Sequence, residues 1–293
     1  GDGFLEYIDE TGHGLANQGW KDSGDSIRWN DGSLATGPIA LAEVQGYAYE
    51  AAVNAADLLD AFGRPGGAEW RDYAEDLAGK FRASFWCADH LGPYPAIALD
   101  VDKRAVDGVA SNMGHLLGTG ILSAEETALV VQRLMHPSMF SGFGIRTLDT
   151  GNAGYWPLRY HAGAVWTHDT AVILQGMAKA GHAREAAQLA AALLDAAEGF
   201  DYRLPELFSG DTAEDGGSRW RIQRLWCVQP VGYRNVPPGG DDCPHPLLPQ
   251  QAAVPSVRNP HVWTLPAVSW VNDPPGGDAC PCWLSPQQVA VDR

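Results

Sequence analysis

The sequence predicts an all-α fold, a partial (α/α)6 toroid of about three helical hairpins, followed by an irregular Pro-rich C-terminal segment. Three observations predict it. Apolar residues recur at helical spacing in paired segments of residues 1–217. The pairs follow one another about every 60–70 residues. Within each pair, the first helix carries polar residues inside its apolar pattern, whereas the second is a plain amphipathic helix.

The first hairpin is predicted over residues 36–62 and 70–86. Both segments keep apolar side chains at helical spacing, among them Ile39, Val44, Ala51, Leu58, Tyr73, Leu77, Phe81 and Phe85. The intervening Gly63-Arg64-Pro65-Gly66-Gly67 ends the first helix, because glycine and proline favour turns over helix.

The second hairpin is predicted over residues 108–121 and 123–135. Its second helix starts at Ser123, and Glu126 stands three residues later. This spacing is typical of a capping box, in which a hydroxyl and a carboxylate bind free amides at the helix start.

The third hairpin is predicted over residues 162–180 and 183–197, with Gly181-His182 as its turn. The first helices of the three pairs contain the polar residues Glu43, Gln45, Asn112, His115, His168 and Asp169. We interpret this asymmetry as two concentric layers, with inner helices around a polar funnel and outer helices facing solvent. A toroid of this kind usually has six pairs, so three pairs indicate half of one.

Residues 218–293 are predicted to form a separate, irregular tail. The tail holds 13 of the 20 prolines and 4 of the 5 cysteines, and it has no lysine and no glutamate. Closely spaced prolines prevent helix and hinder sheet. Cys280 and Cys282 are too close together for a zinc knuckle, so we predict no metal site.

The chain is acidic, with 20 Lys and Arg, 36 Asp and Glu and a formal net charge of −16. Nucleic acid and anionic membranes reward a positive surface, so neither is an expected partner. A neutral oligosaccharide or polysaccharide is compatible with this charge. No apolar run approaches the roughly 20 residues that span a bilayer. No signal peptide is evident, so we expect a cytoplasmic protein, and we expect no cofactor.

A sugar site is predicted in Trp20-Lys21-Asp22-Ser23-Gly24-Asp25-Ser26-Ile27-Arg28-Trp29. Aromatic faces hold pyranose rings, and a carboxyl group can protonate a glycosidic oxygen. A further candidate carboxylate is Glu206, with Glu214 as its rival in a run of acidic residues. From spacing alone, capping of the following turn is the more common role of Asp22 and Asp25.

Several segments occur in one order along residues 1–217. They are Gly14–Ser26, Gly37–Ala40, Glu43–Tyr47, Ser111–Leu117, Ser141–Thr147, Tyr160–His161, Val165–Asp169 and Leu204–Phe208. In this order they resemble the bacterial amylo-alpha-1,6-glucosidase, or glycogen debranching enzyme-like, proteins. More distantly, the loop at Asp22–Ser26 is similar to the Ser-Gly-X-Asp loop of trehalases and processing alpha-glucosidases.

The resemblance implies an inverting glycosidase, of whose (α/α)6 barrel residues 1–217 are the C-terminal half. It assigns the general acid to Asp25 and the general base to Glu206. Inversion needs one carboxyl group that protonates the leaving oxygen and one that activates water. The expected substrate-binding residues are Trp20, Asp22, Arg28, Trp29, Glu43, Gln45, His115, Arg146, His161, Trp166, His168 and Asp169.

The expected activity is hydrolysis of α-glucosidic bonds in glycogen-like or short oligosaccharides. One alternative is a hydrolase of trehalose or glycosylglycerate-type small glycosides. Another is an inactive fragment that binds carbohydrate weakly, because typical members of the family are more than twice as long. Thr167 stands where these proteins commonly have proline. The resemblance stops at Ser218, and a shifted codon frame over 218–223 would restore the family's segment, so we predict a frame-shifted tail.

Overall fold

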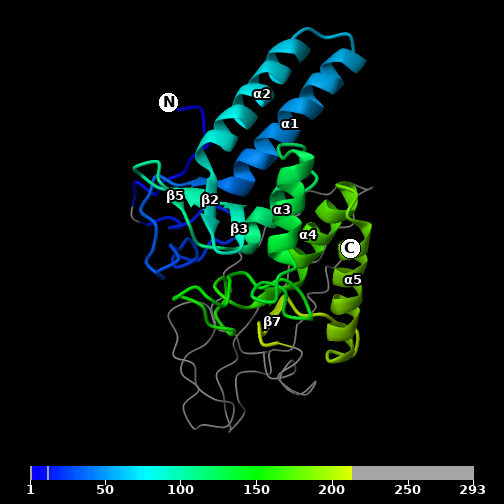
Figure 1. The fold of residues 1–293 in the computed structure, drawn as a ribbon. Helices are drawn as coiled ribbons and strands as arrows, with labels where there is room; N and C mark the ends of the chain where they lie inside the picture. The colour runs from blue at the N-terminus through cyan, green and yellow to red at the C-terminus, as the bar shows by residue number, and fades with distance from the viewer. Residues whose placement is uncertain (1, 12, 213–293) are drawn as a thin grey trace, which may run out of the picture. The chain divides into compact units, whose positions relative to one another are not determined.

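The structure is a computed structural model in which residues 2–11 and 13–212 are described (Figure 1). These residues belong to one compact unit, Gly1–Val231. The helices are α1 Ala42–Ala61, α2 Gly67–Ser84, the 3-10 helix η1 Ser111–Leu116, α3 Ala124–Leu134, α4 Thr167–Lys179 and α5 Ala183–Glu198. The predicted tail over 218–293 lies outside the described residues, and so does Glu214.

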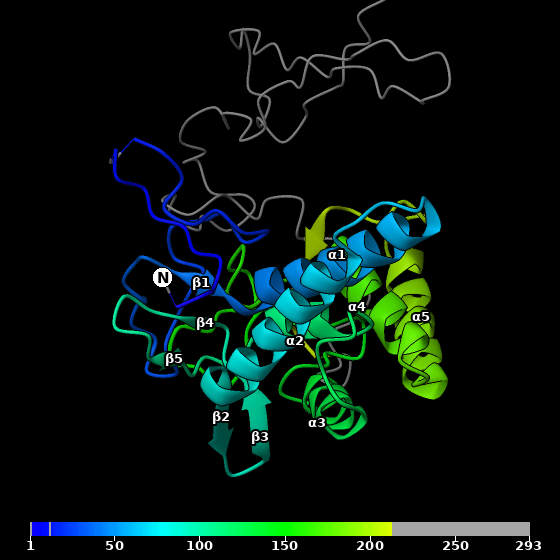
Figure 2. The ribbon, with the colours of Figure 1, turned by 90° about the horizontal axis from the view of Figure 1, so that it is seen from above.

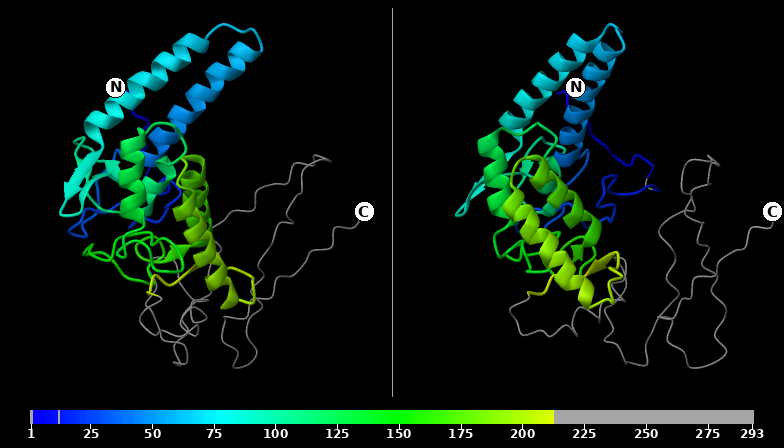
Figure 3. Two further views of the ribbon diagram at one scale, coloured as in Figure 1. Left: turned by 45° about the vertical axis from the view of Figure 1, so that its right-hand side comes forward. Right: turned by 90° about the vertical axis from the view of Figure 1, so that its right-hand side faces the viewer.

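The first predicted hairpin is confirmed as α1 and α2, which extend beyond the other helices in both views of Figure 3. The first helix begins at Ala42 rather than at residue 36. The preceding residues, β1 (Ala40–Leu41), instead pair with β4 (Ala98–Leu99), which uses backbone groups that a helix would need. The buried face of α2 includes Leu77 and Phe81.

Only the second helix of the second predicted hairpin forms. Residues 108–121 contain one short 3-10 helix, η1, all six residues of which are buried. The prediction of an α-helix here is wrong because the chain then turns through Gly118, whose φ of 77° is left-handed. At Gly114, an added Cβ would lie 2.5 Å from Ile173 of α4, so this turn packs directly against α4. Burial on all sides, rather than one helical face, produced the apolar pattern.

The capping box at α3 is confirmed. Ser123 Oγ accepts a hydrogen bond from Glu126 N (3.2 Å), and Glu126 Oε2 accepts one from Ser123 N (2.6 Å). The third hairpin is also confirmed, as α4 and α5. Its first helix begins at Thr167 rather than at residue 162, because β6 (Val165–Trp166) pairs with β7 (Leu207–Phe208).

Three small antiparallel sheets accompany the helices, so the fold is mostly helical rather than all-α. They are β1–β4–β5, with β5 at Ala105–Val106, then β2–β3, at Trp86–Asp89 and Gly92–Pro95, and β6–β7. Strands of two to four residues are too short for an alternating apolar pattern to be seen in the sequence.

The largest core lies among η1, α3, α4 and α5. In Figures 1 and 2, α3 lies between the β2–β3 hairpin and the α4–α5 pair. The buried side chains of this core include Met113, Val130, Leu134, Ile173, Met177 and Leu189. Among the helices that the structure describes, none combines the length and apolarity needed to cross a membrane.

Candidate active site

The loop that carries the two aspartates is held by buried hydrogen bonds. The Lys21 side chain is buried, and its Nζ donates to the carbonyl oxygen of Thr147 (2.6 Å). A hydrogen bond of 2.8 Å joins Ser23 Oγ to His161 Nδ1. These two contacts fix the chain immediately before and after Asp22, so tertiary contacts determine the orientation of this loop.

Trp20 lies at the centre of a cluster of aromatic rings. Its ring stacks on His115, with 5.6 Å between centroids and an interplanar angle of 13°. His161, Trp166 and His168 meet it edge-on, with centroid separations of 5.5, 5.8 and 5.2 Å. The structure thus brings together these five residues, which the sequence predicts as sugar-binding.

Glu206 reaches the aromatic cluster through the β6–β7 pair. The backbone N–H of Thr167, at the start of α4, donates to Glu206 O (3.2 Å), and Thr167 Oγ1 donates to Pro205 O (2.8 Å). Proline at position 167 could not make the first of these bonds. The Tyr160 hydroxyl donates to Glu206 Oε1 (3.5 Å), and Trp166 Nε1 donates to Tyr160 O (2.6 Å).

The pKa of the Glu206 carboxyl is raised. Although the residue as a whole is exposed, partial burial of its carboxyl group is the main cause of the rise. The Tyr160 hydrogen bond and the charge of His168 lower the pKa, whereas the charge of Asp22 raises it. The pKa of Tyr160 is also raised, first by burial and then by Glu206 and Asp22. Asp22 therefore lies close enough to both groups to act on them electrostatically.

Asp25, the predicted acid, lies in a different environment. Arg28 Nη2 is 3.0 Å from Asp25 Oδ2, and Arg159 Nε is 3.7 Å from the same oxygen. Ser23 Oγ donates to Oδ1 (3.1 Å). Both carboxylate oxygens of Asp25 are thus engaged, and only 13% of its side chain is exposed.

A buried polar network lies behind Trp20. Asn112 Nδ2 donates to Glu43 Oε1 (2.8 Å), and His115 Nε2 lies 2.7 Å from Asp169 Oδ1. The Tyr47 hydroxyl is hydrogen-bonded to His115 Nδ1. This network accounts for four of the polar residues on the predicted first helices, Glu43, Asn112, His115 and Asp169, because each has a buried polar partner.

Lys21 is the cation of this network. Burial lowers the pKa of Lys21 to about 8, and the negative charges of Asp169 and Glu43 oppose that shift. Burial raises the pKa of Glu43, against the effects of His115, Asn112 and Lys21. The positive charge of Lys21 and the negative charges of Asp169 and Glu43 therefore compensate one another in a region closed to solvent.

His161 presents a neutral ring to the cluster. Burial, followed by the charges of Lys21 and His168, lowers the pKa of His161 to about 2. Because the single proton of the Ser23 hydroxyl goes to Asp25, Nδ1 of His161 is the donor to Ser23. Nε2 is then an acceptor, and it has no hydrogen-bond partner in the described part of the chain. This atom is buried, so within the described residues it is an unpaired acceptor directly beneath the cluster.

Four predicted substrate-binding residues lie away from the aromatic cluster in structural roles. Arg146 is fully buried and donates to the carbonyl oxygens of Gly210 (2.5 Å) and Pro137 (2.8 Å). The amide of Gln45 bonds to the backbone of Leu5 and Leu41. Arg28 pairs with Asp25, and the ring of Trp29 packs under the guanidinium of Arg104 (5.2 Å).

Sequence reasoning missed Lys21 and Tyr160 as members of the site. A lysine between Trp20 and Asp22 gives no sign of burial in the sequence. Tyr160 stands beside His161 in one of the segments that carry the resemblance, and this position could have identified it.

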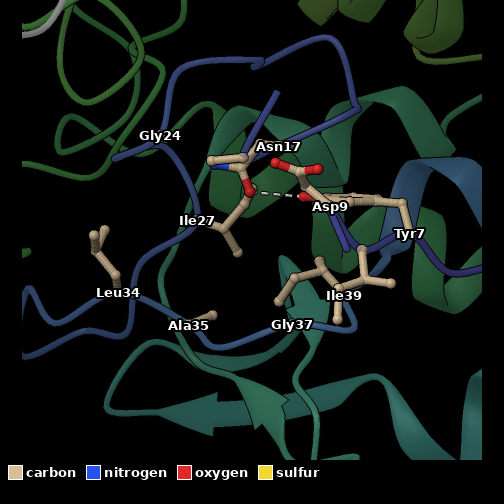
Figure 4. A pocket seen from close by; sticks show the side chains of 11 residues that line it. Tyr7, Asp9, Asn17, Gly24, Ile27, Leu34, Ala35, Gly37 and Ile39 are labelled. Atoms are coloured by element: carbon tan, nitrogen blue, oxygen red, sulfur yellow. Dashed lines mark hydrogen bonds between the residues drawn. The ribbon is translucent and has the colours of Figure 1, made fainter. Parts of the chain in front are cut away.

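A cavity of about 340 Å³ lies elsewhere, on the N-terminal part of the chain (Figure 4). Mainly apolar side chains line it, including Ile27, Leu34 and Ile39, and Tyr7 OH donates to Asn17 Oδ1 (2.7 Å) at its wall. Neither Asp22 nor Glu206 lines this cavity, and it contains no pair of carboxylates suited to glycoside hydrolysis. No group of three or more metal-binding side chains occurs within residues 2–11 and 13–212.

Two solved glycosidases have a fold similar to that of this chain. A neutral trehalase from Saccharomyces cerevisiae matches with a TM-score of 0.52 and 16% identity over 64% of this chain and 37% of that one. A GH63 mannosylglycerate hydrolase from Thermus thermophilus matches in complexes with Tris and with glucose. Both matches have a TM-score of 0.50 and 16% identity over 59% of this chain, and they cover 41% and 40% of that protein. The chain therefore spans about two fifths of the length of these proteins.

The family comparison covers most of the described region. No curated protein sequence matches the chain. The family model of the mannosylglycerate hydrolase MGH1-like glycoside hydrolase domain matches residues 6–221. Together with the structural matches, this supports the six-hairpin glycosidase group, whereas debranching activity stays a prediction. With about three quarters of its residues inside the match, the chain belongs to the MGH1-like glycoside hydrolase domain family.

Proposed function

We propose that the protein hydrolyses α-glucosidic bonds by an inverting two-carboxylate mechanism. The observation that best supports this proposal is the position of Glu206 at the edge of the Trp20 cluster. Its carboxyl group has a raised pKa, and the negative charge of Asp22 lies nearby. A carboxylate at the edge of an aromatic surface suits a base that activates water beside a sugar ring. Tyr160 holds this carboxylate by a hydrogen bond.

The general acid belongs to the loop of Asp22 and Asp25, and the resemblance to trehalases favours Asp25. The rings of Trp20, Trp166 and His168 offer apolar faces and edges to a pyranose. These groups orient the sugar, so that the water activated by Glu206 attacks its anomeric carbon.

Substrate size separates two candidates. Glycogen-like chains are favoured by the resemblance to debranching enzymes. Small glycosides are favoured by the family match and by the related mannosylglycerate hydrolase, whose structure holds glucose. An assay of glucose release by the full chain distinguishes the two substrate classes. The substrates are branched limit dextrin, maltooligosaccharides, trehalose and glucosylglycerate. Turnover that persists in Glu206→Gln would contradict the mechanism.

A weak carbohydrate-binding remnant is the second candidate function. It is favoured by the exposure of Leu58 (59%), Phe62 (76%) and Leu194 (63%) on α1, its end and α5. Binding of maltooligosaccharides without any turnover would support this function over hydrolysis.

A further inference from the structure

A proton donor needs an oxygen that the leaving group can reach. Both oxygens of Asp25 already have partners. Ser23 Oγ donates to Oδ1, and Arg28 and Arg159 lie at 3.0 and 3.7 Å from Oδ2. A guanidinium does not lose its proton in proteins, so Arg28 stays a charged partner of Oδ2 and occupies this oxygen. Asp25 is therefore suited to hold the loop rather than to deliver a proton.

Asp22 has the opposite surroundings. Within residues 2–11 and 13–212, no hydrogen bond or ion pair involves its carboxylate, and the residue is partly exposed. Its charge acts on Tyr160 and Glu206, which places it near the proposed base. The negative charge of Asp22 raises the pKa of Glu206, so the two carboxyl groups are close enough to interact, as an acid and base pair requires.

The backbone around Asp22 is rigid, which a catalytic group needs. Trp20 stacks on His115, Lys21 Nζ is bonded to Thr147 O, and Ser23 Oγ is bonded to His161. The side chains on either side of Asp22 thus bond to the interior. Among the described residues, the Asp22 carboxylate has no hydrogen-bond or ion-pair partner. Such an arrangement fixes the Cα of Asp22 and leaves its carboxyl group for a ligand.

We propose that Asp22, rather than Asp25, is the proton donor of this site, with Asp25 as a positioning residue. The inference rests on the proposed glycosidase function. In the step, the oxygen of water bonds to the anomeric carbon while the bond to the glycosidic oxygen breaks. The water proton passes to Glu206, and the proton of Asp22 passes to the leaving oxygen. Exchange with solvent then restores both groups.

The test compares Asp22→Asn with Asp25→Asn in the full chain, on an O-glycoside and on α-glucosyl fluoride. Fluoride leaves without a proton donor, so loss of the donor spares this substrate. We expect Asp22→Asn to lower kcat/KM on the O-glycoside by about 100–10,000-fold and on the fluoride by less than about tenfold. Asp25→Asn should change both substrates by the same factor and lower the thermal midpoint. Glu206→Gln should abolish turnover of both.

Every other result bears on the assignment of Asp22 as proton donor. Selective loss on the O-glycoside in Asp25→Asn, or full O-glycoside turnover in Asp22→Asn, would overturn the assignment and leave the glycosidase function standing. If Asp22→Asn loses both substrates equally, its role is binding rather than proton donation. If the parent chain turns over none of these substrates, the proposed function is wrong and the assignment is wrong with it. As a second readout, Asp22→Asn should remove the basic limb of the pH profile of kcat/KM.

Discussion

At the scale of residues, the surroundings of a side chain decide its chemistry more than its type does. Asp22 and Asp25 are three positions apart and both are partly exposed. Asp25 is bound by Ser23 and two arginines, whereas Asp22 acts electrostatically on Glu206 and Tyr160. Two carboxylates that look equivalent in the sequence therefore differ in the reactions open to them.

Replacing Tyr160 by phenylalanine should shift the pH dependence of activity. The hydroxyl bond to Glu206 lowers the pKa of that carboxyl, so its loss raises the pKa further. A base must be ionised to activate water, so the acidic limb of kcat/KM should move to higher pH. Asp22→Asn removes a negative charge and should move the titration of Glu206 to lower pH.

The matched control is Tyr202→Phe, because Tyr202 is 70% exposed. It should leave the acidic limb in place. A limb that moves to lower pH in Tyr160→Phe would contradict the proposed contact with the base.

At the scale of elements, short-range signals located the helix starts and stops well. The Ser123 capping box and the glycine-rich stop after α1 occur as predicted. The failures lie where chain segments from elsewhere intervene. Residues 37–41 and 162–166 are not helical, because β1 and β6 within them find partners in β4 and β7. Helix η1 stays short because the chain turns at Gly118.

Two helical glycines should respond in opposite ways to alanine. Gly79 in α2 has open space where a Cβ would be, so Gly79→Ala should stabilise by about 0.5–1 kcal/mol. At Gly176 in α4, a Cβ would lie 2.6 Å from Leu117 O, a backbone atom. Gly176→Ala should destabilise by about 1–3 kcal/mol, because α4 and the end of η1 must separate. Urea unfolding measures both, and equal stabilisation would contradict this close packing.

At the scale of the whole molecule, the compact unit and the family match end at similar positions, Val231 and residue 221. The unit contains all of the candidate site residues, while the acidic charge of the chain is concentrated before residue 218. A chain of 31.4 kDa that spans two fifths of related glycosidases therefore carries both proposed catalytic carboxylates.

A chain that ends at Val231 should keep the fold and the activity of the parent. The reason is that the compact unit is complete at that residue. We expect a thermal midpoint within about 4 °C of that of the full chain, which corresponds to roughly 1 kcal/mol or a little more. Circular dichroism and glucose release measure the two properties. Loss of cooperative unfolding would show that residues 232–293 are part of the folded unit.

The sequence by itself determined the mostly helical class and the hairpin repeat, and it predicts a sugar-binding role for the Trp20 loop. These follow from local spacing and composition, which act over one or two turns of chain. Only the tertiary structure decided which carboxylates meet. Pairing of β6 with β7 brings Glu206 to the Trp20 cluster, and Arg159 joins Arg28 at Asp25. Electrostatic partners separated by more than a hundred residues leave no periodic trace in the sequence, so the roles of Asp22 and Asp25 depend on the fold.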